Sequence, residues 1–230
     1  MTQHILSGEP PITVVLRRSA RARRISLRVS RLDGRVTLTI PAKTSEREAL
    51  AFAESKLDWV RGHLADRPEQ IDVQLGTELP FQGDLIEVVA GQGRNVRLQE
   101  GQVAVPGPDE RVGARLQGFL KEEARRRLIA AVDGYAAALG RPYSKITLRD
   151  TRSRWGSCNS AGALMFSWRL ILGPSEVLSY VAAHEVAHLA QMNHSQAFWD
   201  VVERIYGPHK DERRWLKDHG EKLHRYRFDG

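Results

Sequence analysis

The sequence predicts an α+β protein, in which a β-rich N-terminal part precedes a part that holds most of the helices. Two observations support this fold class. Runs such as ISLRVSRLDGRVTLTIP alternate apolar and polar residues with the period of a β-strand, whereas ARLQGFLKEEARRRLIAAVDGYAAALG has the spacing of a long amphipathic helix. The 230 residues are 41% hydrophobic, which is ordinary for a globular protein.

The N-terminal part is predicted to begin with a β-hairpin and a helix. Alternating runs flank Leu32-Asp33-Gly34, and an Asp-Gly pair in that setting is typical of a tight turn between antiparallel strands. Pro41 ends the second strand. Ser45 is the expected N-cap of a helix over about 46–64, because Glu48 follows three residues later and apolar residues recur at helical spacing.

A domain boundary is expected near VPGPDERVG, where proline and glycine cluster. Strand-like runs in 75–106, such as DLIEVVA and NVRLQEGQVAVP, precede that boundary. The sequence therefore predicts a basic, β-rich region with one helix over 1–107 and a second domain over 108–230, either as separate domains or packed as a single unit.

The second domain is predicted to contain a helix, two strands and three further helices. The first helix ends at Gly140, a typical C-cap residue. KITLRDTR and ALMFSWRLIL are expected strands on either side of the turn-rich segment RSRWGSCNSAG, and Gly173-Pro174 ends the second strand. Ser175 is the expected N-cap of a helix over about 175–192. SQAFWDVVERIYG and DERRWLKDHGEKLHRY are the last two helices.

The charge distribution favours anionic partners. The net charge is +7, and residues 17–31, RRSARARRISLRVSR, contain seven arginines and no acidic residue. This segment is either a solvated strand surface that discourages edge pairing or a patch that binds phosphates. We recognise neither a signal peptide nor an apolar run of the about 20 residues that span a bilayer, so a cytoplasmic protein with no membrane partner is expected. Cys158 is the single cysteine, which excludes an intrachain disulfide.

A candidate metal site lies in YVAAHEVAHLAQMNHSQAFW, residues 180–199. His184, Glu185 and His188 form an H-E-x-x-H motif, and residues four apart on a helix lie on the same face. Two imidazoles so placed can bind one Zn²⁺, while Glu185 lies beside them and suits the general base that takes a proton from a water. The alternative is a pair of buried histidines that hydrogen-bond within an apolar core.

His194 is the best candidate for the third metal ligand that a catalytic zinc site needs. It follows His188 by six residues, as in the metzincin pattern, but Gln191 replaces the metzincin glycine and no methionine follows Met192. We therefore accept the ligand spacing without the metzincin fold, and expect Asn193 to allow the turn by a left-handed conformation. The rival third ligands are Glu203, Glu212, His209 and His219. Glu203 or Asp200 is a candidate to orient a ligand imidazole.

The block RSRWGSCNSAGALMFSWRLILGPSEVLSYVAAHEVAHLAQMNHSQAFW resembles the signature of the YgjP-like metallopeptidase family and, more distantly, that of the SprT-type zincins. In that family an Arg-Trp-Gly-Ser-Cys turn, a strand, an H-E-x-x-H helix and an Asn-His-Ser-x-x-Phe-Trp segment follow one another. The N-terminal hairpin and the helix with Trp59 are also similar, so the resemblance covers most of the chain. It implies a zincin-like catalytic half with His184, His188 and His194 as ligands and Glu185 as base.

Several other residues are candidates for roles around the site. Tyr180, one turn before His184, either donates to a developing oxyanion or is a core tyrosine with a paired hydroxyl. Arg154 either binds an anionic group of the substrate or pairs with an acidic side chain. Phe198 and Trp199 are expected in the core beside the site. ALMFSWRLIL is either a core strand or an edge strand that pairs with an extended substrate.

The leading functional hypothesis is a zinc-dependent metallopeptidase that acts on a peptide or protein. A metal-dependent phosphohydrolase acting on a nucleotide is the first alternative, since the basic segment suits phosphates. A DNA-associated protease of SprT type is the second, with nucleic acid on the basic surface. A binding module with a structural zinc is disfavoured, because structural sites have four protein ligands and the chain has a single cysteine.

Overall fold

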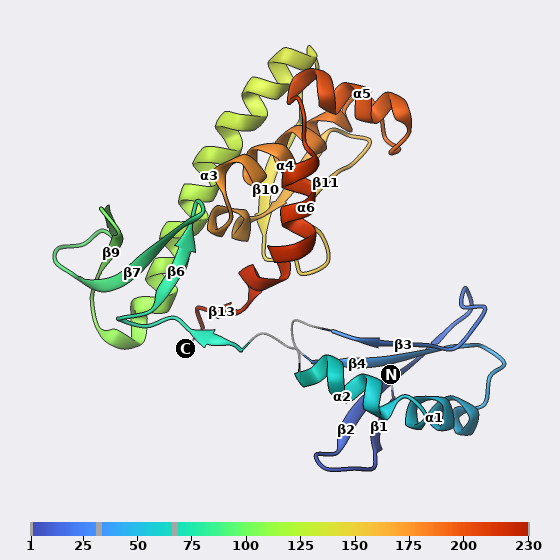
Figure 1. Ribbon diagram of the computed structural model, residues 1–230. Helices are drawn as coiled ribbons and strands as arrows, with labels where there is room; N and C mark the ends of the chain where they lie inside the picture. Colours follow the sequence, from blue (N-terminus) through green and yellow to red (C-terminus); the bar gives the residue numbers. More distant parts are fainter. Residues whose placement is uncertain (1, 31–33, 66–68, 230) are drawn as a thin grey trace. The chain divides into compact units, whose positions relative to one another are not determined.

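The computed structural model describes residues 2–30, 34–65 and 69–229 (Figure 1). The chain divides into two compact units, Met1–Glu69 and Gln70–Gly230. The sequence placed the domain boundary between residues 107 and 108, whereas the compact units meet between Glu69 and Gln70. The reason is that apolar side chains of the intervening strands, such as Val88 and Val103, share one core with the long helix that follows. The division of roles between the two regions stays a prediction.

The N-terminal unit contains a four-stranded sheet with the order β1-β2-β4-β3, in which β2 and β4 are parallel and the other pairs antiparallel. The strands are β1 (Thr2–Leu6), β2 (Ile12–Ser19), β3 (Ser26–Val29) and β4 (Val36–Pro41). The predicted antiparallel pair is confirmed, and its second strand ends at Pro41. Gly34 has a positive φ of 70°, as the turn requires, but Leu32 and Asp33 lie outside the described residues.

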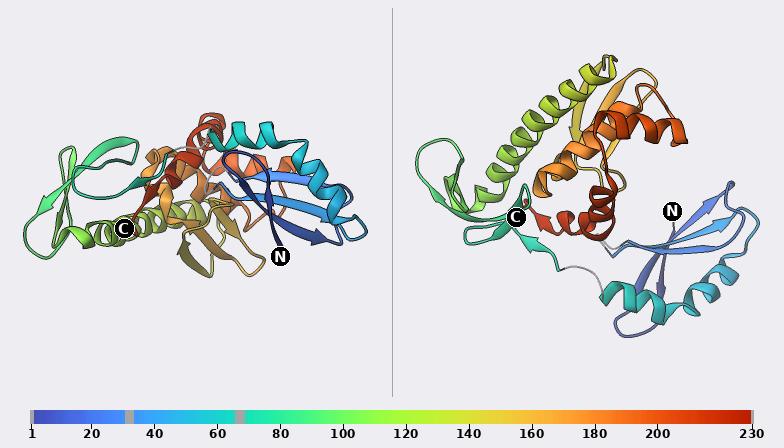
Figure 2. Two further views of the ribbon diagram at one scale, coloured as in Figure 1. Left: turned by 90° about the horizontal axis from the view of Figure 1, so that it is seen from below. Right: turned by 45° about the horizontal axis from the view of Figure 1, so that its top comes forward.

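Two helices cover one face of this sheet (Figure 2). They are α1 (Glu46–Glu54) and α2 (Leu57–Ala65). The predicted N-cap is confirmed, since the Ser45 hydroxyl accepts a hydrogen bond from the Glu48 amide at 3.2 Å. The single predicted helix over 46–64 is wrong, because the chain turns at Ser55-Lys56. There the Ser55 hydroxyl donates to the carbonyl of Phe52 at 2.8 Å, a local bond that competes with helical pairing.

The C-terminal unit begins with a second four-stranded sheet of order β6-β7-β9-β8. Its strands are β6 (Glu78–Phe81), β7 (Asp84–Gly91), β8 (Arg97–Gln99) and β9 (Gln102–Pro106). Strand β5 (Ile71–Asp72) pairs in parallel with β13 (Tyr226–Arg227), so the start and the end of this unit lie side by side. A short 3₁₀ helix, η1 (Asp109–Arg111), leads into the next element.

Helix α3 (Val112–Leu139) is the long helix that the sequence predicts, and Gly140 ends it in the left-handed conformation. It buries a stripe spaced by four residues, including Leu116, Leu120 and Leu128. Helix α4 (Ser175–Ala187) packs alongside α3 (Figure 1). Across the described residues, no helix combines the length and the apolar content needed to cross a membrane.

A three-stranded sheet of order β10-β12-β11 completes the core around α4. Its strands are β10 (Lys145–Arg149), β11 (Gly156–Cys158) and β12 (Ala163–Ser167). After α4 come α5 (Gln196–Ile205), α6 (Lys210–His219) and the 3₁₀ helix η3 (Gly220–His224). Helices α5 and α6 both contact α4. The predicted α+β class, with a small sheet and several helices around the H-E-x-x-H segment, is confirmed.

Three local predictions in this region are wrong. The expected strand over 163–172 ends at Ser167 and continues as the 3₁₀ helix η2 (Trp168–Leu172), because five consecutive buried side chains do not fit an alternating strand. Ser175 is the first residue of α4 and makes no cap, since the extended Pro174 precedes it. Helix α4 ends at Ala187 instead of continuing to about 192, and a tighter turn follows.

Arg169 joins the C-terminal segment to Asp150, the residue that follows β10. Its guanidinium, on a side chain 10% exposed, donates to both carboxylate oxygens of Asp150 at 2.7 and 3.0 Å. It also donates to the carbonyls of Leu223 and Tyr226 at 3.1 and 3.0 Å. These four hydrogen bonds fix the end of the chain beside η2.

We expect Arg169→Met to lower the free energy of unfolding by about 3 kcal/mol, because it leaves an acid and two carbonyls without their donor. The estimate lies at the low end for a buried pair, since the Asp150 side chain is 41% exposed. Urea unfolding followed by circular dichroism measures the change, with the exposed Arg141→Met as the control that should change stability little. A loss below about 1 kcal/mol for Arg169→Met would contradict this role.

Candidate metal centre

Helix α4 places the H-E-x-x-H residues at the C-terminal end of a buried helix. Nine of its thirteen residues are buried, including Glu185. His184 lies in its last turn, and His188 is the C-cap with αR backbone angles, so the two imidazoles stay on one face although the helix ends between them. A helix so buried has no polar face to solvate these groups, so each needs a partner within the fold.

Three histidines converge at this end of α4. The ligand atoms of His184, His188 and His194 all lie within 4.8 Å of one another and form a group that could hold a metal ion. The Nε2 atoms of His184 and His194 are 3.1 Å apart. Two nitrogen atoms bound to a tetrahedral zinc at about 2.0–2.1 Å lie roughly 3.3 Å from each other, so the observed spacing suits that ion.

The outward-facing nitrogen atoms of two of these imidazoles have partners. His188 Nδ1 lies 2.9 Å from the carbonyl of Gln191, to which an N–H donates. His184 Nδ1 lies 3.4 Å from the hydroxyl of Tyr180. The carbonyl of Gln191 can only accept, so this contact favours the His188 tautomer that leaves Nε2 without a proton, which is the form that binds a metal. Burial and the charges of His188 and His194 lower the pKa of His184 to about 3, so it stays neutral at physiological pH.

The structure places Tyr180 behind the metal centre. Its side chain is 4% exposed, its hydroxyl faces His184 Nδ1, and burial raises the pKa of Tyr180 to about 12. This position matches the expectation of a core tyrosine with a paired hydroxyl, and it suits orientation of the His184 ring better than contact with an oxyanion.

A turn between His188 and His194 brings the third imidazole next to the other two, and its geometry differs from the expected one. Leu189 and Ala190 donate to carbonyls three residues back, which tightens the backbone after His188. Among the described residues other than glycine, Gln82 has a positive φ and Asn193 does not, so the expected left-handed Asn193 is wrong. Instead, the Asn193 side-chain oxygen accepts a hydrogen bond from the Ser195 amide at 3.2 Å. This Asx-type bond makes the turn without a glycine.

Glu185 lies against strand β11. A Cβ placed on Gly156 would come within 2.5 Å of Glu185 Oε1, so the carboxylate occupies the space that any larger residue at 156 would fill. Burial raises the pKa of Glu185 to about 8, and the positive charge of Arg154 opposes this shift. A cation bound by the neighbouring histidines would lower the pKa further, toward the ionised form that a general base requires.

We expect Gly156→Ala to reduce hydrolytic activity by about 10²-fold, because displacement of a catalytic group by about 1 Å has an effect of that size. The φ of Gly156 is not among the positive values, so the effect comes from the contact with Glu185 and not from backbone strain. Measurement of kcat/KM and metal content tests it. Gly118→Ala in α3 is the matched control, since nothing lies within 4 Å of its added methyl group and activity should not change. Equal activity of the two variants would contradict the expected contact.

Phe198 supports all three histidines from α5. It is fully buried, and its ring centroid lies 4.9 Å from that of His184, 4.5 Å from His188 and 4.7 Å from His194. Trp199 lies 5.8 Å from the rings of both His184 and His194. The expected core position of Phe198 beside the site is therefore confirmed by its burial and contacts.

Two residues next to the site have positions that the sequence does not predict. Gly156 belongs to the Arg-Trp-Gly-Ser-Cys turn, but a single sequence does not show that a glycine is needed there to leave room for the Glu185 carboxylate. His209, named from the sequence only as a rival ligand, is 8% exposed and stacks between the rings of Tyr180 and Trp199, with centroids at 5.6 and 5.5 Å. Only the packing of α6 against α4 reveals it.

The rival ligands lie elsewhere in the described part of the chain. Glu203 is 3.4 Å from His209 Nδ1, Glu212 accepts from the Tyr206 hydroxyl at 3.0 Å, and His219 contacts Trp215. None of them belongs to the three-histidine group. Asp200 accepts from Gln196 at 2.8 Å, so neither expected carboxylate orients a ligand imidazole; Tyr180 and the Gln191 carbonyl take that place.

Arg154 and strand β12 also have defined positions. Arg154 is exposed, close enough to Glu185 to influence its pKa, so a substrate contact remains a prediction. Of the two readings of ALMFSWRLIL, the structure supports a core strand and not an edge strand, because β12 lies between β10 and β11. The edge strand that passes beside Glu185 is β11.

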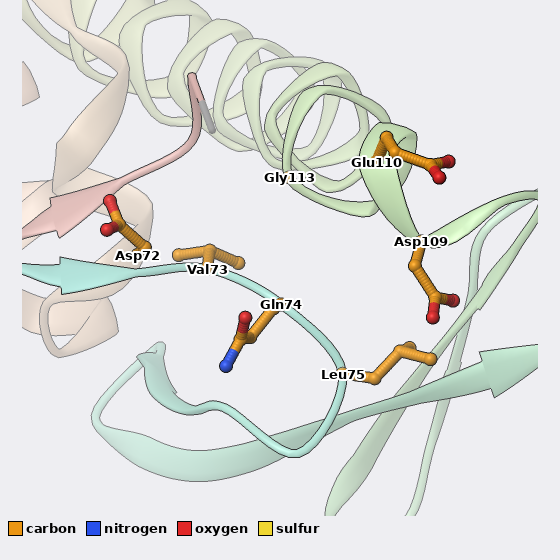
Figure 3. Close-up of a pocket in the computed structure, with 7 residues that line it drawn as sticks. All are labelled: Asp72, Val73, Gln74, Leu75, Asp109, Glu110 and Gly113. Carbon is orange, nitrogen blue, oxygen red and sulfur yellow. The ribbon is translucent and has the colours of Figure 1, made fainter.

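A separate hollow of about 340 Å³ lies near the start of α3 (Figure 3). Its lining includes Asp72, Gln74, Asp109 and Glu110 and none of the candidate site residues. Asp72 pairs with Arg227 at 2.7 Å. Nothing in this hollow indicates a ligand, so we place the functional site at the histidines.

A histidine triad built on an H-E-x-x-H helix with a buried glutamate beside it is the arrangement of the metallopeptidase class. The chain belongs to the YgjP-like metallopeptidase family, since the family model described as "YgjP-like, metallopeptidase domain" matches residues 23–219. The family resemblance predicted from the sequence is thereby confirmed, and with it a hydrolase of metallopeptidase type that uses a metal.

Comparison with curated proteins finds no match. Among solved structures, one match is titled "Crystal structure of the metallopeptidase zymogen of Pyrococcus abyssi abylysin". It is 17% identical, covers 41% of this chain and 93% of that chain, and has a TM-score of 0.36.

Proposed function

We propose that this chain is a zinc-dependent peptidase in which His184, His188 and His194 bind one Zn²⁺ and Glu185 is the general base. The observation that carries the proposal is the convergence of three imidazoles beside a buried carboxylate. Three protein ligands leave a fourth position open, as in catalytic zinc sites. Zinc bound there would polarise the scissile carbonyl and make a water more acidic.

The residues of the chain supply the proton transfers. Glu185 takes a proton from the attacking water, whose oxygen forms a bond to the carbonyl carbon of the substrate. Glu185 then gives that proton to the amine nitrogen as the C–N bond breaks. Its buried position against Gly156 holds the carboxylate in place, and Tyr180 and the Gln191 carbonyl hold the imidazoles.

Strand β11 is the proposed place for the substrate backbone. It is an edge of its sheet, paired on one side with β12, and it passes Glu185 at Gly156. An extended peptide that adds to such an edge lies across the general base. The exposed Arg154 precedes the strand and suits an acidic group of the substrate.

The test compares substrates and metals on the full chain. Fluorogenic unstructured peptides should be cleaved, activity should disappear with a zinc chelator, and stoichiometric Zn²⁺ should restore it. Nucleoside triphosphates are assayed in parallel for phosphate release. Phosphate release without peptide cleavage would replace the proposal by the metal-dependent phosphohydrolase, and neither activity in a zinc-loaded protein would contradict a hydrolytic role for this site.

A further inference from the structure

The positive charge of the chain is concentrated in its N-terminal unit. Residues 1–69 contain 13 arginines and lysines against 8 acidic residues, so this unit carries +5 of the total charge of +7. The charges are also separated within the unit. Four of its acidic residues, Glu46, Glu48, Glu54 and Asp58, belong to the helices, whereas most of its arginines lie on the strands and on the loop between β2 and β3.

One face of the N-terminal sheet is open and basic. Leu16 and Leu38 are buried with α1 and α2 in one core, so the alternate residues of these strands point to the other face. On that face Arg17 pairs in register with Thr39, and Arg28 pairs with Thr37. Both arginines are exposed.

The loop before β3 extends this basic surface. Arg21, Arg23 and Arg24 lie between Ser19 and Ser26 and are exposed. In contrast, the guanidinium of the exposed Arg18 already donates to the carbonyls of Ala42 and Thr44, so we leave it out of this surface. We call Arg17, Arg21, Arg23, Arg24 and Arg28 the arginine surface.

An exposed aromatic ring lies beside β3, an edge strand of this sheet. Trp59 is 44% exposed, and with Leu27, Phe52 and Lys56 it lines a hollow of about 290 Å³. The ring of His63 packs on Trp59 at 4.2 Å between centroids, which holds the indole in place. Leu27 and Arg28 are neighbours in the edge strand β3, and their side chains point to opposite faces of the sheet. Trp59 therefore lies at this edge on the face covered by the helices, and Arg28 lies at the same edge on the other face.

We propose that this edge of the N-terminal unit binds single-stranded nucleic acid, with the arginine surface on the phosphates and Trp59 stacked on a base. A strand of nucleic acid combines a line of negative charges with unpaired, flat bases, and proteins bind it by a cationic track beside aromatic rings. A duplex offers the charges but not the bases for stacking. The Lys56 ammonium at the hollow adds a further contact for a phosphate.

The inference goes beyond the proposed peptidase activity and does not depend on the metal site. Its experiment therefore uses the full chain with Glu185→Gln, so that hydrolysis plays no part in the measurement. A failure to bind nucleic acid would leave the peptidase proposal intact, and an inactive metal site would leave this inference intact.

The experiment measures fluorescence anisotropy of a labelled 20-nucleotide oligothymidylate at several salt concentrations. We expect binding that weakens as salt rises, since phosphate contacts release counterions. The change R23Q/R24Q/R28Q should weaken binding about tenfold or more and reduce the salt dependence. Trp59→Ala should weaken it about tenfold, and Trp59→Phe should retain most of the affinity because a phenyl ring still stacks.

The matched control removes the same charge from exposed arginines of the other unit, as R94Q/R97Q/R141Q, and should leave the affinity unchanged. Equal loss in this control would show attraction to charge alone and overturn the inference. So would equal affinity for a duplex of the same length with no effect of Trp59→Ala. Binding to vesicles of anionic lipid without binding to the oligonucleotide would assign the surface to a membrane instead.

Discussion

Replacement of Glu185 by glutamine should lower peptide hydrolysis by about 10²–10⁴-fold while the metal stays bound, since general acid–base catalysis contributes that much. Glutamine has nearly the same shape as glutamate, so it fits the buried position against Gly156. It cannot accept the proton of a water, however, so the carbonyl meets a weaker nucleophile. The three histidines are untouched, and for this reason the zinc content should equal that of the unaltered chain.

The measurement is kcat/KM on a fluorogenic peptide together with metal analysis of the same preparation. Glu203→Gln is the matched control, because this carboxylate is 57% exposed and lies near His209 instead of the three-histidine group. It should retain activity. Activity of Glu185→Gln within about tenfold of the unaltered chain would remove Glu185 from the proposed mechanism.

Replacement of His188 by alanine should abolish tight metal binding and the stability that the metal confers. His188 supplies one of three converging imidazoles, and its Nδ1 contact with Gln191 holds both the ring and the turn that brings His194 back. Loss of an outer contact to a metal ligand alone reduces affinity about 10–100-fold, so loss of a ligand should cost more.

Thermal unfolding with and without Zn²⁺ measures this effect. A ligand at 100 times its dissociation constant stabilises the folded state by about 2.7 kcal/mol, so zinc should raise the melting temperature of the unaltered chain. The rise should vanish in His188→Ala and persist in His219→Ala, which removes an exposed imidazole. A metal-dependent rise that survives in His188→Ala would show that the ion binds at another place.

Much of the site could be predicted because its residues lie close together in the sequence. The four-residue spacing of His184 and His188 needs only helical geometry, and that geometry extends through the C-cap although α4 ends at Ala187. His194 was identified by its spacing, and the turn that places it proved to use an Asn193 side-chain bond. A single sequence does not show which of several local hydrogen bonds the backbone adopts.

The ends of helices and strands were predicted less well, since they depend on individual hydrogen bonds and on burial that the hydrophobic pattern does not show. The break between α1 and α2 coincides with the hydrogen bond of the Ser55 hydroxyl to the Phe52 carbonyl, and β12 ends at Ser167 because the next five side chains, Trp168–Leu172, are all buried. The boundary between the compact units follows residue 69 and not residue 107, because apolar side chains of 70–106 share one core with α3.

By itself the sequence determined the α+β class, the metallopeptidase family, the histidine triad and the basic N-terminal segment, since these depend on residue types and on local spacing. Only the tertiary structure decided which groups surround the triad. It placed Gly156 against Glu185, turned Tyr180 toward His184, stacked His209 between two aromatic rings and made β11 the edge strand. Apart from the Tyr180 contact, which lies within α4, these contacts join elements far apart in the chain, and close packing between such elements is set by the whole core, not by any one segment.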